Sequence, residues 1–394
     1  MKTAQNTVPE LRFPEFEGEW KLKRGNDLFL NSRIKGEDGL PIYSVTLNDG
    51  LVPRASLDKK MENDAASGDN LRAQAGDLVY NMMRMWQGAL GLAHEECMIS
   101  PAYVVLSGKA KTDTKFFEYN LKRPRSIYDL WAYSYGLTND RLRLYSKDFL
   151  RIKFRVPEEK LEQQKIASFL SSIDDKLTKL RRKRELLNDF KRGLMQQLFS
   201  QAVRFKQDDG SEFPEWEYEE FRLLVDRVSK SYNSSIETVN YPAIELESLD
   251  QGSGKILNIF NSLDQKSTKT LFNQGDVLFG KLRPYLKKFA RPNFDGVCSS
   301  EIWVLRGKKI TNDFLFFVVQ TSRFQKVVNI QSGSKMPRAD WNSVADAVFL
   351  YPCLEEQQKI ADCLSSFDAK IDAVVKQIQQ LDTFKKGLLQ KMFV

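Results

Sequence analysis

Two segments of the chain carry a long heptad pattern of apolar positions, one in residues 162–200 and one in residues 356–394. Apolar residues follow one another at alternating steps of four and three over more than four heptads, which is typical of a coiled coil. Arg184, Lys191 and Lys385 interrupt the predicted seams. The apolar seam positions are Ile166, Leu170, Ile173, Leu177, Leu180, Leu187, Leu194 and Leu198, and Ile360, Leu364, Phe367, Ile371, Val374, Ile378, Leu381, Leu388 and Met392.

The two heptad segments are copies of one another. Aligned without a gap at an offset of 194, they are identical at 18 of 39 positions. Each follows a proline, Pro157 or Pro352, and carries glutamates in its first turns, where the positive end of a helix dipole favours negative charge. Two copies in one chain favour pairing with each other, and dimerisation of two chains is the alternative. A helix of this length forms a rod of about 60 Å.

The segments before the two helices also repeat. The sequence AGDLVYNMMRM matches QGDVLFGKLRP at an offset of 199, and PAYVVLSGK matches SEIWVLRGK at the same offset. A Gly-Asp turn followed by alternating apolar residues predicts a strand. Residues 113–135 and 312–329 are expected to form amphipathic helices. We therefore expect four parts, namely domains 1–156 and 201–351 and helices 157–200 and 352–394.

The predicted fold class is mixed α/β (α+β). Two similar domains are expected to be separated by two long antiparallel coiled-coil helices, so that the chain has an internal pseudo-two-fold repeat. Length agrees with this organisation, because 394 residues are enough for two or three domains with their own cores.

Composition narrows the classes of function. No apolar run approaches the length of a membrane span, and the first twenty residues contain no hydrophobic signal region. Four scattered cysteines are typical of a reducing cytoplasm, which is the expected location. The net charge of +8 is modest, but residues 121–155 hold nine Lys/Arg against three acids, and residues 281–338 hold twelve against three. Such concentrations indicate contacts with phosphates.

The sequence offers little to support catalysis. The segment QGSGKIL (251–257) lacks the first glycine and the Ser/Thr of a nucleotide-binding loop. No Asn/Asp-Pro-Pro-aromatic run, typical of amino-methyltransferases, is present. His94 and Cys97 are too few for a zinc site. We expect a protein that is not an enzyme, with no catalytic residue, metal or cofactor of its own.

The architecture resembles the specificity subunits of type I restriction–modification systems over essentially the whole chain. The segments PEEKLEQQKIASFLSSIDDKL (157–177) and PCLEEQQKIADCLSSFDAKI (352–371), the two FPE segments and the GDLVY and GDVLF strands carry the resemblance. It implies two target-recognition domains that each recognise half of a bipartite DNA target, at a gap set by the helices.

The resemblance also implies partners. Two adenine-methyltransferase subunits would dock on the helices, and restriction/translocase subunits would join through that complex. S-adenosylmethionine, ATP and Mg are expected on those partners, and no membrane is implied. The alternative function is a coiled-coil scaffold for protein interactions without DNA specificity.

Residues for DNA contact follow from what base recognition requires, namely Arg, Lys, Asn and Gln on loops. The alternative for each of them is a solvated surface group, and for Trp86 it is a place in the core. The candidates in the first domain are Asn81, Arg84, Trp86, Gln87, Asn139, Arg141 and Arg143; those in the second are Lys281, Arg283, Tyr285, Lys287, Lys288, Ser334, Lys335 and Arg338.

Matched glycines interrupt the two helices. Gly193 and Gly387 occupy equivalent positions, where glycine costs up to about 1 kcal/mol relative to alanine. A repeated weakness of this kind predicts close approach of another backbone, either the second helix or a methyltransferase subunit.

Overall fold

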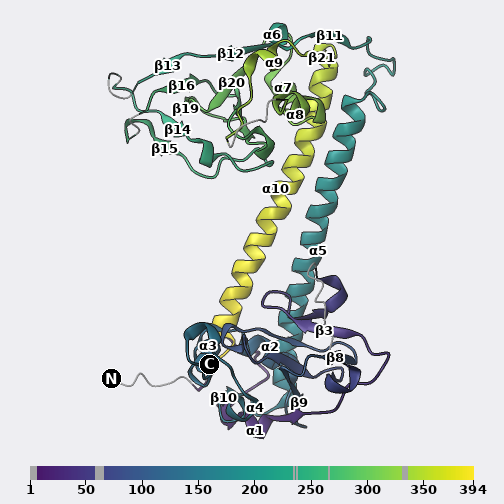
Figure 1. The fold of residues 1–394 in the computed structure, drawn as a ribbon, viewed down its shortest axis with the longest axis vertical. Coiled ribbons are helices and arrows are strands. Elements are labelled where there is room, and N and C mark those ends of the chain that lie inside the picture. The colour runs from purple at the N-terminus through teal and green to yellow at the C-terminus, as the bar shows by residue number, and fades with distance from the viewer. Residues whose placement is uncertain (1–6, 58–65, 234–235, 237, 265–266, 331–335) are drawn as a thin grey trace. The chain divides into compact units, whose positions relative to one another are not determined.

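The computed structural model describes residues 7–394 except 58–65, 234–235, 237, 265–266 and 331–335. The chain divides into two compact units (Figure 1): unit 1 is Met1–Arg181 with Lys376–Val394, and unit 2 is Arg182–Val375. Two long helices contribute to both units, α5 (Lys160–Phe199) and α10 (Leu354–Lys391). Each unit therefore combines one mixed α/β domain with a part of each long helix, as the fold class predicted from the repeats requires.

The globular part of unit 1 is built from short elements. Its helices are α1 (Gly25–Leu28), α2 (Thr114–Leu121), α3 (Pro124–Ala132) and α4 (Ser146–Phe149), with 3-10 turns η1 (Arg54–Ser56), η2 (Ser67–Asp69), η3 (Met85–Gln87) and η4 (Asn139–Arg141). Its strands are β1 (Lys21–Arg24), β2 (Phe29–Ser32), β3 (Ile42–Val45), β4 (Leu51–Pro53), β5 (Leu71–Ala73), β6 (Leu78–Asn81), β7 (Leu90–Leu92), β8 (Cys97–Ile99), β9 (Tyr103–Gly108) and β10 (Lys153–Val156).

The globular part of unit 2 has the same plan. Its helices are α6 (Phe221–Leu224), α7 (Asn312–Val318), α8 (Ser322–Val328) and α9 (Trp341–Ala345), with η5 (Leu246–Ser248), η6 (Ser262–Asp264) and η7 (Pro284–Leu286). Its strands are β11 (Glu217–Glu220), β12 (Val225–Val228), β13 (Ser231–Tyr232), β14 (Pro242–Ile244), β15 (Phe260–Asn261), β16 (Lys269–Phe272), β17 (Val277–Gly280), β18 (Phe289–Ala290), β19 (Gly296–Ser299), β20 (Ile302–Gly307) and β21 (Val348–Tyr351).

Sheet order repeats between the units. A sheet of order β2-β9-β6-β7 in unit 1 corresponds to β12-β20-β17-β18 in unit 2. A second sheet, β4-β3-β8-β5, corresponds to β15-β14-β19-β16, to which β13 is added. In both second sheets one pair is parallel, β3 with β8 and β14 with β19. The two domains thus share a topology although most of their residues differ.

The Gly-Asp turns lie where the sequence predicts them. Gly76 and Gly275 have φ of 92° and 82°, a backbone region that side chains with a Cβ rarely adopt. The aspartates that follow are buried beneath the turn. Asp77 accepts a hydrogen bond from the Gln74 amide at 2.9 Å, and Asp276 accepts the equivalent one. Strands β6 and β17 leave these turns as expected.

Each predicted amphipathic segment is broken into two helices. Residues 113–135 form α2 and α3, because Pro124 starts a new helix at its first position. Residues 312–329 form α7 and α8, and Thr321 caps α8 by accepting a hydrogen bond from the Phe324 amide. The apolar periodicity continues through both breaks, which is why the sequence predicts a single element.

A buried glutamate near the start of α5 ties the globular domain of unit 1 to its helix. Glu162, 2% exposed, accepts hydrogen bonds from Arg12 Nε at 2.8 Å and from Trp20 Nε1 at 3.1 Å. The next residue, Gln163, accepts the Asp113 amide at 2.8 Å. The sequence attributes this glutamate to the helix dipole, whereas the structure makes it a buried counter-ion.

Unit 2 repeats the arrangement at the start of α10. Glu356, 0% exposed, accepts from Arg204 Nη2 at 2.8 Å and from Trp216 Nε1 at 3.1 Å. Gln357 accepts the Thr311 amide at 2.8 Å. The identical Glu-Gln pair in the two helices therefore has the same role in both units, which is to bind the start of the helix to the globular domain.

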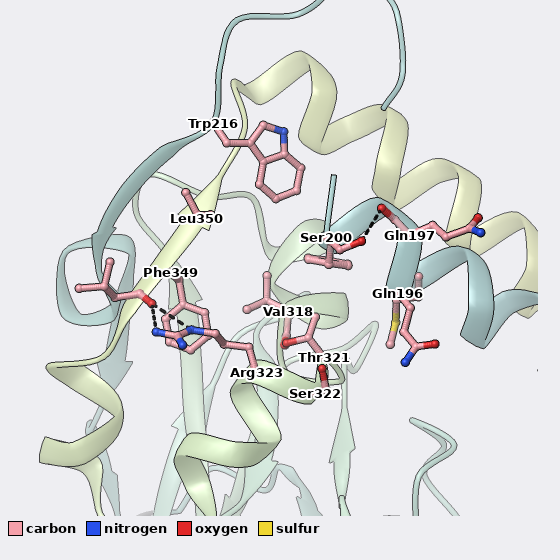
Figure 2. A pocket seen from close by; sticks show the side chains of 13 residues that line it. Gln196, Gln197, Ser200, Trp216, Val318, Thr321, Ser322, Arg323, Phe349 and Leu350 are labelled. Carbon is pink, nitrogen blue, oxygen red and sulfur yellow. Dashed lines mark hydrogen bonds between the residues drawn. The ribbon is translucent and has the colours of Figure 1, made fainter. Parts of the chain in front are cut away.

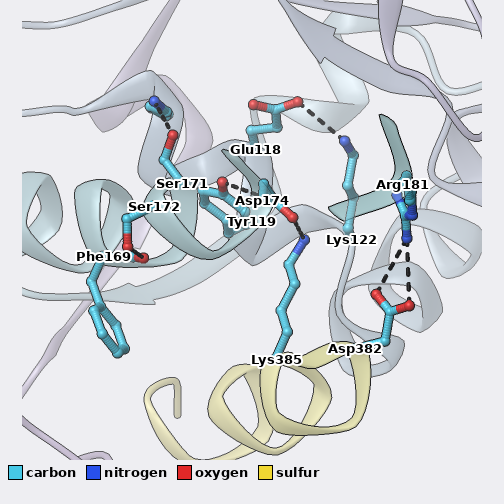
Figure 3. Close-up of polar contacts among 11 residues, drawn as sticks. Glu118, Tyr119, Lys122, Phe169, Ser171, Ser172, Asp174, Arg181, Asp382 and Lys385 are labelled. Atoms are coloured by element: carbon cyan, nitrogen blue, oxygen red, sulfur yellow. Dashed lines mark hydrogen bonds and ion pairs between the residues drawn. The ribbon is translucent and has the colours of Figure 1, made fainter. Parts of the chain in front are cut away.

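Salt bridges fix the direction of helix pairing in unit 1 (Figure 3). Lys385 lies 2.5 Å from Asp174, whose other oxygen accepts the Tyr119 hydroxyl at 2.8 Å. One turn or more along, Arg181 lies 3.3 Å from Asp382. Rising numbers on α5 face falling numbers on α10, so the two helix segments of unit 1 are antiparallel.

The helix segments of unit 2 pair in the same way. Lys191 lies 2.6 Å from Asp368, the equivalent of the Lys385–Asp174 pair at the offset of 194. Beside it, the rings of Phe190 and Phe367 have centroids 5.2 Å apart. The two seam lysines, which appear in the sequence as weak points of the heptad, are thus neutralised by acids on the other helix.

The seam is buried unevenly. Arg184 is exposed, and side chains near the middle of α5 are the least covered. The buried positions are Ile166, Leu170, Ile173, Leu177, Leu198, Ile360, Leu364, Ile371, Val374, Ile378, Leu388 and Met392; the half-buried ones are Leu180, Leu187, Leu194, Phe367 and Leu381.

The last phenylalanine of each heptad segment packs into a domain core. Phe393 lies against Trp20 and Phe116, with ring centroids 6.1 and 5.1 Å away. At the matched place in unit 2, Phe199 stacks on Phe314 at 5.3 Å. Each globular domain is therefore completed by the end of the helix that follows the other domain in the chain.

Candidate nucleic-acid interface

The first group of predicted contacts in unit 1 follows strand β6. Asn81 ends the strand and is buried, and its Oδ1 accepts the Met83 amide at 3.0 Å, so this side chain shapes the turn. Trp86 is half-buried and donates from Nε1 to the Met83 carbonyl at 3.0 Å. Arg84 and Gln87 are exposed. From this loop, only the last two present freely accessible polar groups.

The second predicted group lies on the loop around η4. Tyr135 and Arg143 form an isolated antiparallel bridge that closes the loop. Arg141 and Arg143 are exposed on it, whereas the side chain of Asn139 lies outside the described residues. In the described part of unit 1, the guanidinium groups of Arg84, Arg141 and Arg143 have no hydrogen bond or ion pair. Three unpaired cations on neighbouring loops suit phosphates or guanine edges.

In unit 2 the loop after β17 has an unusual backbone. Arg283 and Lys287 have φ of 51° and 50°, in the left-handed region that non-glycine residues seldom occupy. They flank η7, which begins at Pro284, and the Lys287 amide donates to the Pro284 carbonyl at 2.8 Å. Both side chains are exposed. Strain of this kind persists where surrounding structure imposes it, often at functional loops.

The remaining candidates of this loop differ in accessibility. The amino group of Lys288 is less available for DNA contact, because its Nζ donates a hydrogen bond to the Leu246 carbonyl at 2.8 Å. Lys281 is half-buried, while Tyr285 is 53% exposed. Arg283, Tyr285 and Lys287 are therefore the accessible members of the group.

The last group, residues 334–338, is only partly described. Ser334 and Lys335 lie outside the described residues. Arg338 donates to both oxygens of Glu301 at 3.1 and 3.3 Å, and this pairing raises the pKa of Arg338. Its charge is already balanced, so DNA would have to compete with Glu301 for it.

The same backbone hydrogen bond joins the two loops in each unit. In unit 1 the Leu144 amide donates to the Met82 carbonyl at 2.9 Å. In unit 2 the Ala339 amide donates to the Lys281 carbonyl at 2.8 Å, and Lys281 follows Met82 at the offset of 199. Groups that lie more than fifty residues apart in the sequence thus form one surface in each unit.

An apolar pocket of about 660 Å³ lies beside the end of α5 in unit 2 (Figure 2). Trp216, Phe349 and Leu350 line it, and Arg323 at its edge donates to the Val348 carbonyl at 2.8 Å. Its lining includes no Asp, Glu, His, Cys or Lys. The pocket therefore offers neither a general base nor a metal ligand among the described residues.

The described residues lack the features of several other kinds of site. They include no group of three or more His, Cys, Asp or Glu that could hold a metal ion. No helix in the described part of the chain is long and apolar enough to cross a membrane. Burial raises the pKa of the Cys97 thiol to about 11, which disfavours a reactive thiolate.

The sequence is similar to specificity subunits of type I restriction enzymes. A family model described as the type I restriction modification DNA specificity domain matches residues 227–383. The type I restriction enzyme MjaVIII specificity subunit of Methanocaldococcus jannaschii is 24% identical over 96% of this chain and 92% of its own length. The EcoDI specificity subunit of Escherichia coli is 25% identical over 45% of this chain and 41% of its own.

Solved structures share the fold. The crystal structure of a type I restriction–modification S subunit from M. genitalium matches 98% of this chain and 99% of its own, with a TM-score of 0.61 at 16% identity. A chain from a structural study of complex assembly and conformational transition in the type I system matches 95% and 97%, with a TM-score of 0.52 at 15% identity. In sequence and in fold, the chain is thus similar to the specificity subunits of type I restriction–modification systems.

Proposed function

We propose that units 1 and 2 each recognise one half of a bipartite DNA target, and that the long helices set the gap and dock two methyltransferase subunits. The observation that carries the proposal is the repeated loop pair, held by the same backbone hydrogen bond but carrying different side chains. Two loop pairs with the same backbone arrangement but different side chains are suited to recognising two different DNA sequences. The continuity of α5 and α10 through both units supports the role in spacing.

Replacing Arg84 or Arg283 by alanine is expected to affect one half-site each. A good bidentate base contact is worth about 1–3 kcal/mol, so affinity should fall about five- to 150-fold, with relaxed preference in one half. Arg338→Ala should have a smaller effect, because its guanidinium is already paired with Glu301. The measurement is binding of the subunit, with its methyltransferase, to duplexes varied in one half-site at a time.

Binding experiments distinguish the proposed DNA recognition from the alternative function, a scaffold for protein interactions. DNA binding that contacts many phosphates should weaken steeply with salt concentration. A variant that changes preference in both halves equally would contradict independent recognition. Absence of salt-sensitive binding to any duplex would favour the scaffold.

A repeated surface on the helices supports docking of two copies of one partner. Phe190 and Phe384 are identical in the two copies yet 58% and 54% exposed. Each is followed one turn later by a glycine, Gly193 or Gly387, where an added Cβ would meet no described atom within 4 Å. The second helix therefore does not explain these glycines, and the open space beside them allows close approach of a partner subunit.

Phe384 lies at the edge of a groove. A groove of about 390 Å³ lies between the helix segments of unit 1, lined by Lys176, Leu180, Gln377, Gln380, Leu381 and Phe384. An exposed aromatic ring beside a groove and an open glycine suits an amphipathic helix of the partner.

Loss of the two phenylalanines is expected to prevent assembly. Phe190→Ala or Phe384→Ala alone should leave one methyltransferase bound, and the double variant should lose both, because a buried aromatic anchor contributes on the order of 2 kcal/mol or more, roughly 30-fold. Mass photometry of the complex gives the stoichiometry. Leu161→Ala, at another exposed apolar residue of α5, is the control. Unchanged stoichiometry in the double variant would place docking elsewhere.

A further inference from the structure

The interface of unit 1 carries exposed apolar residues that the sequence did not single out. Tyr128 and Trp131 lie on α3, and both are exposed, with ring centroids 5.8 Å apart. Tyr135 and Leu137 follow on the loop after α3, and Leu137 is 99% exposed. An exposed group of this size on a folded domain indicates an interaction site.

These side chains belong to the surface that holds the unpaired arginines. Helix α3 packs against η3, where a Cβ on Gly88 would lie 2.7 Å from Ile127. The backbone of Tyr135 exchanges two hydrogen bonds with Arg143, at 3.0 and 2.8 Å. Leu137 is therefore an exposed residue of a closed loop, and in the sequence it lies between the aromatic residues of α3 and the cations of the η4 turn.

The charges favour nucleic acid over protein as the occupant. Arg84, Arg141 and Arg143 have no ion pair within the described chain, and the described part of the η4 loop carries one acid, Asp140, beside them. An isobutyl group at the tip of such a loop cannot donate or accept a hydrogen bond. The one apolar group that a base pair presents in the major groove is the 5-methyl of thymine.

We infer that Leu137 is a specificity-determining residue that recognises a thymine of the target through its 5-methyl group. This inference rests on the proposed function, since it requires that unit 1 contact DNA. Tyr128 and Trp131 then cover the adjacent sugar–phosphate backbone, and the three arginines bind phosphates or guanine edges.

The test removes one methyl group at a time. The recognised sequence is obtained by mapping methylated adenines in a host that expresses the chain with its methyltransferase. In that site each thymine of the half recognised by unit 1 is replaced by deoxyuridine. For the wild-type complex, one replacement should weaken binding about three- to fivefold, as expected for burial of one methyl group. Leu137→Ala should weaken binding to the thymine site and abolish sensitivity to that replacement.

The control is Leu22→Ala, at an exposed leucine of β1, which should behave as wild type. A wild-type complex indifferent to every replacement, or a Leu137→Ala complex that keeps the sensitivity, would overturn the inference. Loss of the methyltransferase from the Leu137→Ala complex with unchanged base preference would assign the surface to a protein contact and overturn it too. Failure of the proposed function looks different, since no specific site would then be methylated.

Discussion

A fragment of residues 1–200 is expected to dimerise and, with its methyltransferase, to modify a palindromic site made of the first half-site and its inverted repeat. The fragment keeps one recognition domain and all of α5, but it lacks the segment of α10 that pairs with α5 in unit 1. A second copy of α5 can take that place, because the two helices are copies at an offset of 194. Two identical readers related by a two-fold axis match a palindrome.

Individual contacts support this substitution. Lys191 of a second copy would occupy the position of Lys385, opposite Asp174. Phe199 would occupy the position of Phe393, against Trp20 and its neighbours in the core of unit 1. Arg184 is the weak point, since its counterpart is a buried residue, Ile378.

Sedimentation equilibrium at tens of micromolar measures the association. Asp174→Ala should weaken the dimer about tenfold, because it removes two ion pairs of about 0.5–1 kcal/mol each. Arg184→Ile should strengthen it, because an apolar side chain then fills the seam. A monomeric fragment, or a modified site with two different halves, would contradict the prediction.

Glu356→Ala is expected to destabilise unit 2 by about 3–5 kcal/mol. The carboxylate is fully buried, and its removal leaves the guanidinium of Arg204 without its buried counter-ion and the indole N–H of Trp216 without its acceptor. Breaking a buried pair by deleting one partner has a cost of this size. Glu162→Ala should do the same to unit 1, where Arg12 is the cation.

Hydrogen exchange followed by mass spectrometry assigns the loss to a unit. Glu356→Ala should lower the protection of β17 and β20 but not of β6 and β9, and Glu162→Ala should give the reverse. Glu355→Ala is the matched control, because Glu355 is exposed beside the buried position. Equal loss in both units from either variant would show that the two units unfold together.

The sequence predicted the helices, the repeat and the strands well, because each depends on local pattern. The heptad sets the faces of α5 and α10, and the Gly-Asp turns of Gly76 and Gly275 need a backbone that glycine adopts easily. The break at Pro124 could also have been found, since proline at the first helical position is a strong signal.

The interface was less predictable, because accessibility depends on contacts between distant residues. Nothing near Arg338 in the sequence indicates that Glu301 neutralises it, and nothing near Asn81 indicates that its amide closes a turn. Leu137 lies in a predicted contact loop but was missed, because base recognition was expected from Arg, Lys, Asn and Gln, and the structure leaves this leucine 99% exposed. The role of Glu162 needed Arg12, 150 residues away in sequence.

Unit 1 combines segments from both ends of the sequence, so its core cannot be completed until the whole chain has been synthesised. Its first 181 residues leave the ribosome early, yet the helix segment Lys376–Val394 that completes its core is made only after all of unit 2. At about 5–20 residues per second, the first domain waits roughly 10–40 s with the site of Phe393 unfilled. During that time a nascent chain exposes an apolar helix face that suits a second nascent chain on the same messenger. The antiparallel pairing of α5 with α10 therefore also creates a kinetic competition between pairing within one chain and pairing with a neighbouring chain.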